Sequence, residues 1–369
     1  MQAFDVQVSG AGIVGKTLAL SLAGFGLSVA LRSRPVSAAA ASDVRAYALS
    51  PASIDLLQRL KVWDAIAADA RTAVHDMVVR GDADDAELEF SAWQQRVAEL
   101  AVITDAAALD QELDNALRFA AHVTRVDTDV PAALVAHCEG RAAVSALGAA
   151  TVFERSDYGQ RAIAARLVAT LPHRHTARQW FRSPDVLALL PFDRPERERS
   201  YALVWSLPSE RAEALLAMDA TAFEHALAAA AGAAVGTLAL VSERASWPLV
   251  VAAASEWSGP GWVLVGDAAH VVHPLAGQGL NLGLADVVAL AAVIAGRESW
   301  RGVGDERLLR RYGRQRAAPT WAMRQITDGL LRLFATPSAP IRELRNNGMS
   351  LVNRVPPLKR WLTARALDS

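Results

Sequence analysis

The start of the chain alternates between short apolar runs and a helical repeat. Residues 4–9 (FDVQVS) form an apolar run that ends at a glycine turn, a helical pattern follows (KTLALSLAGFGL), and residues 28–31 form a second apolar run. Two short buried runs joined by a helix are typical of a βαβ unit with parallel strands. The pattern therefore predicts an α/β fold at this end of the chain.

The pattern changes at residues 177–206. Three short apolar runs (QWF, VLALLPF and YALVW) are separated there by Ser-Pro-Asp and by a charged turn, RPERER, which is typical of an antiparallel sheet. The run at 262–265 returns to the parallel type, so we expect the antiparallel sheet to be inserted into the first domain. Helices are predicted over residues 53–70, 106–121 and 209–231.

Composition and charge narrow the class of protein. The 369 residues are 52% hydrophobic and 21% charged, which excludes a disordered chain. The formal net charge of −1 gives no reason to expect nucleic acid as a partner. The single cysteine and the lack of a signal-peptide pattern predict a cytoplasmic protein. The charge is uneven, because residues 297–369 hold fifteen basic and six acidic side chains.

Three glycines follow the first predicted strand at the spacing G-x-G-x-x-G, namely Gly10, Gly12 and Gly15. In a strand–turn–helix context the first glycine permits the turn, the second lets a pyrophosphate approach the backbone, and the third lets the helix pack on the strand. The free N–H groups at the start of the helix then bind phosphate. The motif predicts that a dinucleotide binds here.

The residues after the second strand leave the identity of the dinucleotide open. An Asp or Glu usually holds the adenosine ribose at this point, whereas this chain has Arg32, Ser33 and Arg34. The two arginines suit a 2′-phosphate, as in NADP. Alternatively, they are solvated and Ser33 makes a weaker hydrogen bond to the ribose.

A second glycine-rich segment follows the strand at 262–265. Residues 266–283 read GDAAHVVHPLAGQGLNLG, and this string resembles the FAD-dependent aromatic hydroxylases related to para-hydroxybenzoate hydroxylase, in particular their ubiquinone-biosynthesis branch. Asp267 is placed to accept hydrogen bonds from the ribityl hydroxyls of a flavin, Gly266 lets the cofactor pass close to the backbone, and Pro274 stiffens the segment beside the isoalloxazine ring.

The helix after this segment directs its free N–H groups toward the flavin N1–C2=O edge, where its dipole stabilises the anionic reduced flavin. The residues that open this helix, and that we predict to contact the cofactor, are Gly277, Gln278, Gly279, Leu280 and Asn281. Residues 43–50 (DVRAYALS) also resemble a family segment whose arginine lies against FAD, which implies the same role for Arg45.

Three positions depart from the family pattern. Ser33 replaces the ribose acid, Ala107 stands in a helix that usually offers a polar or basic side chain, and Glu139 replaces the aspartate of an Asp-Gly motif. Glu139 keeps the charge, and we count it among the cofactor-binding residues together with Ser33. Because charged hydrogen bonds are lost at the adenosine end, we expect FAD to bind less tightly than in typical relatives.

The resemblance implies an α/β fold with an α+β insertion and C-terminal helices. The predicted Rossmann-like FAD-binding domain is discontinuous, the antiparallel-sheet substrate domain is inserted into it, and a helical region ends the chain. The predicted bounds are 1–75, 96–150 and 255–296 for the first domain, 76–95 and 151–254 for the second, and 297–369 for the helical region.

The activity implied by the resemblance is that of an FAD-dependent monooxygenase. NADPH or NADH reduces FAD, and O2 then supplies the oxygen that hydroxylates the aromatic ring of a polyprenylated phenol in ubiquinone biosynthesis. The cofactor carries the chemistry, so we assign no catalytic side chain and expect no metal. The basic region 297–369 suggests peripheral contact with the inner membrane or with other ubiquinone-pathway proteins.

Two other classes stay open. A non-catalytic accessory or scaffold relative in a biosynthetic complex is favoured by the depleted adenosine end. A flavin hydroxylase that acts on a small soluble aromatic has the same cofactor motifs. A plain NADP dehydrogenase built on Arg32 and Arg34 would leave residues 266–283 unexplained.

Overall fold

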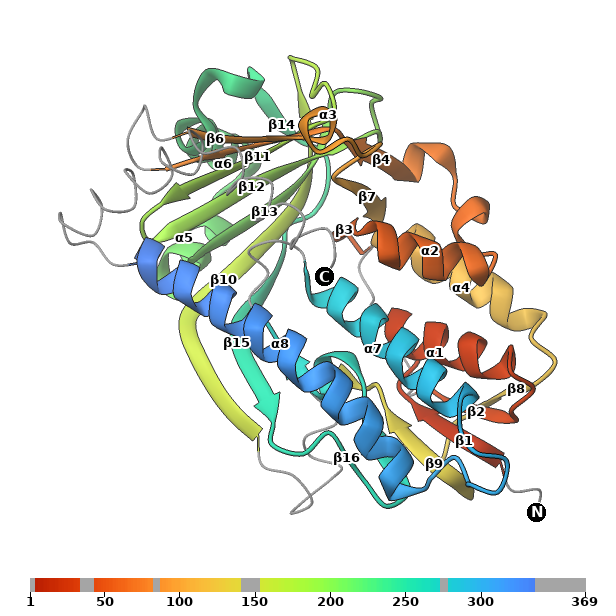
Figure 1. The fold of residues 1–369 in the computed structure, drawn as a ribbon. Coiled ribbons are helices and arrows are strands. Elements are labelled where there is room, and N and C mark those ends of the chain that lie inside the picture. Colours follow the sequence, from red (N-terminus) through yellow and green to blue (C-terminus); the bar gives the residue numbers. More distant parts are fainter. Residues whose placement is uncertain (1–3, 34–42, 82–86, 141–152, 273–277, 336–369) are drawn as a thin grey trace.

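The computed structural model describes the chain over residues 4–33, 43–81, 87–140, 153–272 and 278–335. Within these ranges the strands form sheets of six, nine and three strands (Figure 1). The predicted fold class, an α/β protein with an inserted antiparallel sheet, is confirmed. The division into domains stays a prediction.

The six-stranded sheet contains the predicted βαβ unit. Its order is β16-β17-β9-β1-β2-β8, and all neighbouring pairs are parallel except β16 and β17. Helix α1 (Ile13–Ala23) joins β1 to β2 and packs against α4 (Ala106–Arg118) and α7 (Gln278–Ala295). The strands run over β1 Phe4–Ser9, β2 Val29–Arg32, β8 Val123–Val126, β9 Ala132–His137, β16 Ser258–Gly259 and β17 Trp262–Leu264.

The nine-stranded sheet is antiparallel apart from the pair β11 and β5. Its order is β18-β15-β10-β13-β12-β11-β5-β6, with β14 paired to β10. Two strands from the first hundred residues therefore extend a sheet whose other strands come from residues 153–271. The strands run over β5 Asp76–Arg80, β6 Glu87–Ser91, β10 Phe153–Ala169, β11 Thr176–Arg182, β12 Asp185–Phe192, β13 Ser200–Pro208, β14 Leu238–Leu240, β15 Ala245–Ala254 and β18 His270–Val271.

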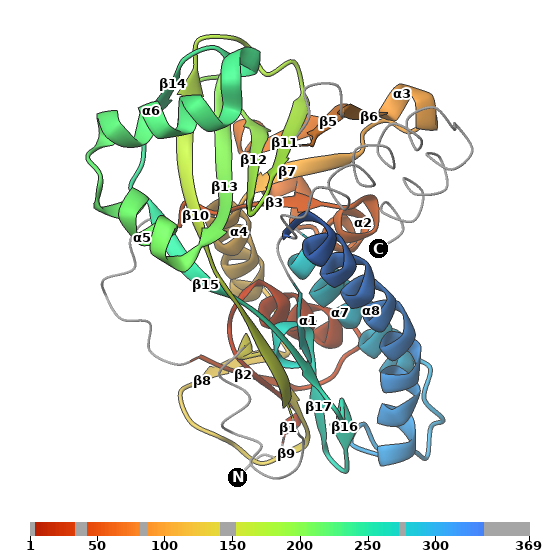
Figure 2. The same cartoon turned by 90° about the vertical axis from the view of Figure 1, so that its left-hand side faces the viewer.

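The two faces of this sheet have different surroundings. Helices α5 (Ser209–Ala217) and α6 (Ala220–Ala231) lie on one face, as Figure 2 shows, and a buried apolar cluster that includes Leu187 and Leu189 fills the space beneath them. Successive residues of a strand point to opposite faces. Ala188, between these leucines, and Leu190 after them therefore point away from the helices, toward the rest of the protein.

A three-stranded sheet links the two larger ones. It has the antiparallel order β3-β7-β4, with β3 at Ala46–Leu49, β4 at Arg71–Val74 and β7 at Ala101–Asp105. The remaining short elements are α2 (Pro51–Arg59) and α3 (Ala92–Gln95). Ser50 caps α2, because its side chain accepts a hydrogen bond from the Ser53 N–H.

Two predicted helices are shorter than expected. The helix expected over 53–70 ends at Arg59, because Lys61 adopts a left-handed φ of 59°, and two short 3-10 turns follow it. The helix expected over 209–231 is interrupted at Met218 and restarts after Asp219, whose side chain accepts a hydrogen bond of 2.8 Å from the Ala222 N–H. In both cases local backbone chemistry overrides a continuous helical pattern.

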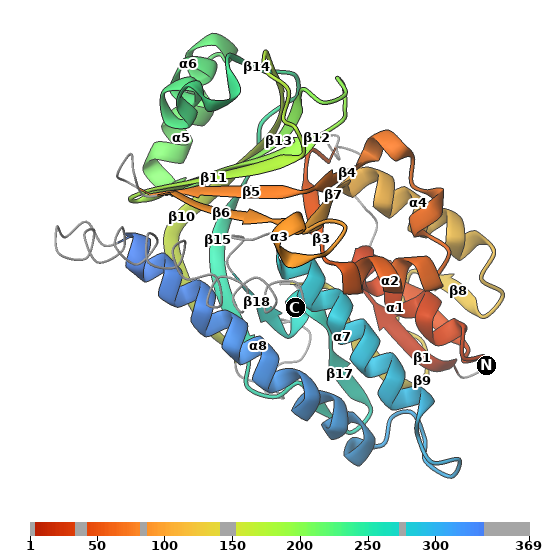
Figure 3. The ribbon, with the colours of Figure 1, turned by 45° about the horizontal axis from the view of Figure 1, so that its top comes forward.

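The last described helix, α8 (Glu306–Ala335), packs along α7, and Figure 3 shows the two helices side by side. Among the helices of the described ranges, none combines the length and the apolar character needed to cross a bilayer.

Candidate functional site

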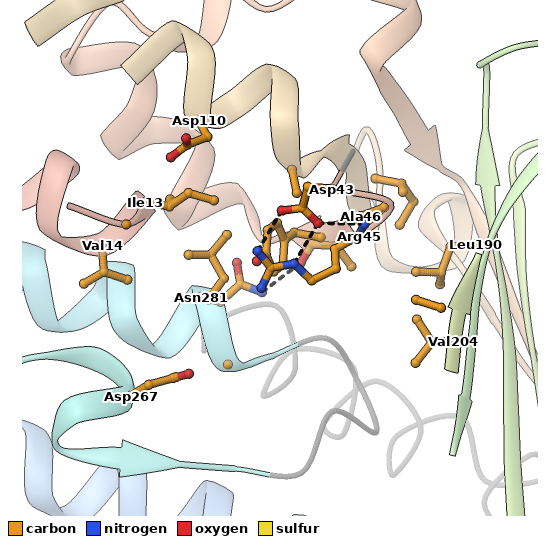
Figure 4. Close-up of a pocket in the computed structure, with 18 of the residues that line it drawn as sticks. Ile13, Val14, Asp43, Arg45, Ala46, Asp110, Leu190, Val204, Asp267 and Asn281 are labelled. Carbon is orange, nitrogen blue, oxygen red and sulfur yellow. Dashed lines mark hydrogen bonds and ion pairs between the residues drawn. The ribbon is translucent and has the colours of Figure 1, made fainter. Parts of the chain in front are cut away.

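A cavity of about 1430 Å³ lies where the three sheets meet. One end is lined by the turn after β1, by the segment before β3, by α4 and by the first turn of α7. The other end is lined by the inner face of the antiparallel sheet. Figure 4 shows this arrangement, with Asp110 and Val14 on one side and Leu190 and Val204 on the opposite side. The cavity thus joins a polar end to an apolar end.

The glycines of the first motif have different neighbours. A Cβ on Gly15 would lie 1.9 Å from the Gly10 carbonyl oxygen, and Gly10 itself has a φ of +106° and packs on the backbone of Cys138. A Cβ on Gly12 would meet no atom within 4 Å, although Gly12 lines the cavity. Two glycines therefore close the turn, and the third leaves an opening through which a ligand can reach the backbone.

The start of α7 has a similar opening. Gly279 lines the cavity, and a Cβ there would also meet no atom within 4 Å. Leu280 lines the same end. Asp267 faces it as well: its side chain is exposed, whereas Gly266 and Ala268 on either side are buried. The two glycine openings and the carboxylate of Asp267 share one cavity, and this set fits an extended dinucleotide such as FAD.

Arg45 and Asp43 form a bidentate ion pair at the wall of this cavity. The Arg45 Nε and Nη2 atoms lie 2.8 and 2.7 Å from the two carboxylate oxygens of Asp43. Burial alone would raise the pKa of Asp43, but the hydrogen bonds and charge of Arg45 outweigh it, so this pKa lies below its ordinary value. The same hydrogen bonding raises the pKa of Arg45. The pair is therefore ionised near neutral pH.

Asn281 lines the cavity but uses its amide group inside the protein. Its Oδ1 accepts hydrogen bonds from the Ser50 N–H at 3.0 Å and the Ser53 hydroxyl at 2.8 Å, and its Nδ2 donates to the Ala48 carbonyl at 2.8 Å. These bonds join the start of α7 to the turn between β3 and α2. Asn281 thus positions the two segments that frame the cavity.

Three predicted cofactor-binding residues cannot be placed fully. Pro274 and Gly277 lie outside the described residues. Gln278 is the first residue of α7, but the structure describes only its backbone. Gly266 does not line the cavity, because it packs against Val14 and Gly283.

Ser33 and Glu139 are not among the residues that line the cavity. The Glu139 carboxylate accepts a hydrogen bond of 2.7 Å from Arg32 Nη2 and lies 3.3 Å from His137 Nδ1. Burial opposes ionisation of Glu139, yet these partners keep its pKa below the ordinary value. Arg32 also pairs with Asp129 at 3.1 Å. Arg32 is therefore already bound to two carboxylates, which argues against its predicted use for a 2′-phosphate.

A polar stripe on α4 was missed by the sequence analysis. Side chains three and four positions apart on this helix line the cavity beyond Gly12, namely Asp110, Gln111, Asp114, Asn115 and Arg118. The signal was available, because residues at this spacing from Ala107 share one helix face. The buried Lys16 of α1 pairs with two of them, at 2.8 Å from Asp110 and 2.9 Å from Asp114.

The other end of the cavity is lined mostly by apolar side chains, many of them small, together with Phe90, Trp247 and the polar Gln179. Ala188 and Leu190 of β12 face it, opposite in direction to the leucines beneath α5 and α6. Strand register places Ala188 beside Val204 of β13, and Val204 beside Ala164 of β10. The alanines that line this end are Ala164, Ala177, Ala188 and Ala245. Small side chains leave room for a bulky apolar ligand.

Comparison with known proteins agrees with this geometry. A family model described as an FAD binding domain matches residues 88–327. The chain is 31% identical to the ubiquinone hydroxylase UbiL of Rhodospirillum rubrum, over 99% of this chain and 90% of that protein. It is 30% identical to the 3-demethoxyubiquinol 3-hydroxylase of Escherichia coli, over 99% of both chains. The crystal structure of p-nitrophenol 4-monooxygenase PnpA from Pseudomonas putida superposes with a TM-score of 0.76 at 17% identity, and covers 100% of this chain and 99% of that one.

Proposed function

Since this chain belongs to the family of the FAD binding domain, we propose that it is an FAD-dependent monooxygenase of ubiquinone biosynthesis. Its reaction is the hydroxylation of the aromatic ring of a polyprenylated phenol, with NADPH or NADH as electron donor and O2 as the oxygen source. The observation that carries the proposal is the cavity of about 1430 Å³, because it connects a polar end with open backbone at Gly12 and Gly279 to a mostly apolar end.

Residues at the polar end would hold FAD. The open backbone at Gly12 and the N-terminus of α1 are suited to the pyrophosphate, Asp267 to the ribityl hydroxyls, and Gly279 at the start of α7 to the flavin edge. Arg45 and the stripe on α4 lie along the same wall. FAD supplies the redox chemistry with O2 when it is bound.

The apolar end would bind the substrate and exclude water from the reacting ring. Pockets for drug-sized ligands are usually about 300–1,000 Å³, and the cavity here is larger at about 1430 Å³. The volume suits a cofactor together with a bulky substrate. No lining residue of this end is assigned as an acid or base, so the role of the chain there is to orient the ring and to keep it dry.

The apolar lining also bears on the alternatives. The residues of the antiparallel sheet that line this end are mostly apolar, but they also include Arg178 and Gln179 of β11, and Gln179 pairs with Ala188. A scaffold protein needs no open backbone at Gly12 or Gly279. The open backbone supports an enzyme over a scaffold, and the mostly apolar lining suits a lipid-like substrate.

Contact with a membrane or with pathway proteins through residues 297–369 stays a prediction. In the described part of this region several arginines have acidic partners. Arg301 pairs with Glu298 and Asp305, Arg310 with Glu306, and Arg311 with Glu298. These pairs reduce the charge available for an anionic surface. Six of the fifteen basic side chains of this region belong to residues 336–369, which lie outside the described residues.

The test is turnover by FAD-loaded protein. NADPH and NADH oxidation and O2 uptake would be measured with a prenylated phenol and with an unprenylated one, and the product analysed by mass spectrometry for the gain of one oxygen atom. We expect product with the prenylated phenol. Oxidation coupled only to the small phenol would favour the soluble-substrate alternative, and a flavin-loaded protein that forms no product from any phenol would contradict the proposal.

A further inference from the structure

A carboxylate with no exposed surface lies behind the flavin end of the cavity. Asp286, in the middle of α7, is 0% exposed. Its Oδ2 accepts a hydrogen bond of 2.9 Å from the Gly266 N–H and lies 2.7 Å from His270 Nε2. Its Oδ1 accepts a hydrogen bond of 2.7 Å from Arg316 Nε. One side chain therefore connects the 3-10 turn Gly266–Ala268, β18, α7 and α8.

This carboxylate is ionised in the fold. Burial alone would raise the pKa of Asp286, but the nearby His270 and Arg316 outweigh burial and keep the pKa below its ordinary value. A buried charge is tolerated only where partners surround it, and the removal of one partner leaves the other charge uncompensated. Arg316 is itself only 12% exposed at its side chain. Asp286 and Arg316 thus form an ion pair that is largely shielded from solvent.

The hydrogen bond to Gly266 fixes the residue that precedes Asp267. Gly266 has a φ of +65°, and a Cβ there would lie 3.3 Å from Val14 and 3.6 Å from Gly283. The turn is consequently wedged between α1 and α7. With its N–H fixed by Asp286 and its Cα fixed by packing, Gly266 leaves little freedom for Asp267, whose side chain faces the cavity.

Helix α8 also reaches the same turn through Tyr312. The Tyr312 hydroxyl donates a hydrogen bond of 2.9 Å to the Leu264 carbonyl, two residues before Gly266. Trp257 stacks on His270 with ring centroids 5.1 Å apart and also contacts Tyr312. Yet no residue of the described part of α8 lines the cavity. The helix supports the turn from behind without touching what the cavity binds.

We propose that Asp286 and the α8 residues Tyr312 and Arg316 are positioning residues of the flavin site, through which α8 sets how tightly and in what orientation Asp267 holds the flavin. The inference rests on the proposed function only in placing a flavin at Asp267. Because its readout is flavin binding and not hydroxylation, its failure and the failure of the proposed function are distinguishable.

The test compares Arg316→Gln with Arg316→Lys and with Arg310→Gln in the full chain. Arg310→Gln is the matched control, since Arg310 Nη2 makes an ion pair of 2.6 Å with Glu306 on the exposed side of the same helix. Each apoprotein is titrated with FAD to obtain Kd, the visible circular dichroism of the bound flavin is recorded, and the melting temperature is measured without FAD.

We expect Arg316→Gln to raise the FAD Kd about tenfold or more, as the loss of one charged hydrogen bond implies, and to change the visible circular dichroism of the flavin. Arg316→Lys should recover most of both, because it restores a cation beside Asp286, and Arg310→Gln should match the wild type. An Arg316→Gln protein with unchanged Kd and flavin spectrum overturns the proposal, as does an equal rise in Arg310→Gln.

A milder variant tests the proposal if Arg316→Gln does not fold. Tyr312→Phe removes only the hydroxyl that donates to Leu264. If Arg316→Gln does not fold, Tyr312→Phe decides. A rise in its FAD Kd together with an altered flavin spectrum supports the proposal, and wild-type values of both overturn it.

Discussion

Alanine substitutions at Gly12 and Gly15 distinguish effects on FAD binding from effects on folding, because each adds a single methyl group. In Gly12→Ala the new Cβ meets no protein atom within 4 Å and points into the cavity. In Gly15→Ala it would lie 1.9 Å from the Gly10 carbonyl oxygen. We therefore expect Gly12→Ala to impair FAD binding without harm to the fold, and Gly15→Ala to impair the fold itself.

The magnitudes follow from these contacts. Gly12 is the N-cap of α1 with φ −80° and ψ −179°, a conformation open to alanine, so the free energy of unfolding of the apoprotein should change by less than about 1 kcal/mol. A methyl group that keeps a phosphate off the backbone removes at least one charged hydrogen bond. That loss is worth about 1.5–3 kcal/mol, or roughly tenfold to a hundredfold in Kd. Overpacking in Gly15→Ala should cost about 1–3 kcal/mol or more in stability.

Two measurements are made on each apoprotein. Urea unfolding gives the stability, and titration with FAD, monitored by the quenching of flavin fluorescence, gives Kd. Wild-type stability with a raised Kd in Gly12→Ala, against lowered stability in Gly15→Ala, is the expected pair of results. If Gly12→Ala binds FAD as tightly as the wild type, the pyrophosphate does not cross the backbone at Gly12 and the cofactor end of the cavity has been misassigned.

Three further outcomes are expected. Ala188→Phe fills the apolar end and should abolish turnover of a prenylated phenol while the FAD Kd stays unchanged; retained turnover in the product assay would show that the tail lies elsewhere. Asn281→Ala leaves buried partners at Ser50 and Ala48 without their hydrogen bonds and should lower the unfolding free energy by about 2–4 kcal/mol in urea. The folded-state pKa of Asp286 is depressed, so its contribution to stability is present above the ordinary pKa of 3.8 and is lost as the pH falls through the lower folded value. Asp286→Asn should therefore show a shallower loss of stability as the pH falls below 3.8 in thermal melts, and an unchanged slope would contradict the assignment.

Local rules of sequence explain why some of the site was predictable. The strand, turn and helix around Gly12 follow from apolar spacing and glycine chemistry within a few residues, and the cavity opens where those rules place it. The opposite faces of β12 follow from strand alternation in the same way. The predicted helix ends were less accurate, because a single residue with a left-handed backbone, Lys61, ends a helical pattern that otherwise continues in the sequence.

Pairings between distant residues were not predictable. Asn281 was expected to contact the cofactor, yet its amide bonds to Ser50 and Ala48, more than two hundred residues away. Glu139 was assigned to FAD by its motif, whereas its carboxylate is bound to Arg32, 107 residues earlier. A motif identifies a chemical group, but only the fold shows which partner lies nearest to it.

The charges around the cavity explain how FAD can bind where the ribose acid is missing. A pyrophosphate would meet acidic neighbours at Asp43, Asp110 and Asp114, and each of these carboxylates already has a cation of the chain beside it. Arg45 pairs with the first, Lys16 with the other two, and Arg125 also with Asp114. Because these charges cancel within the protein, attraction for the cofactor rests on the N–H groups and dipole of α1 at Gly12. Backbone groups do not depend on the identity of residue 33, so we expect the site to bind FAD with a serine there.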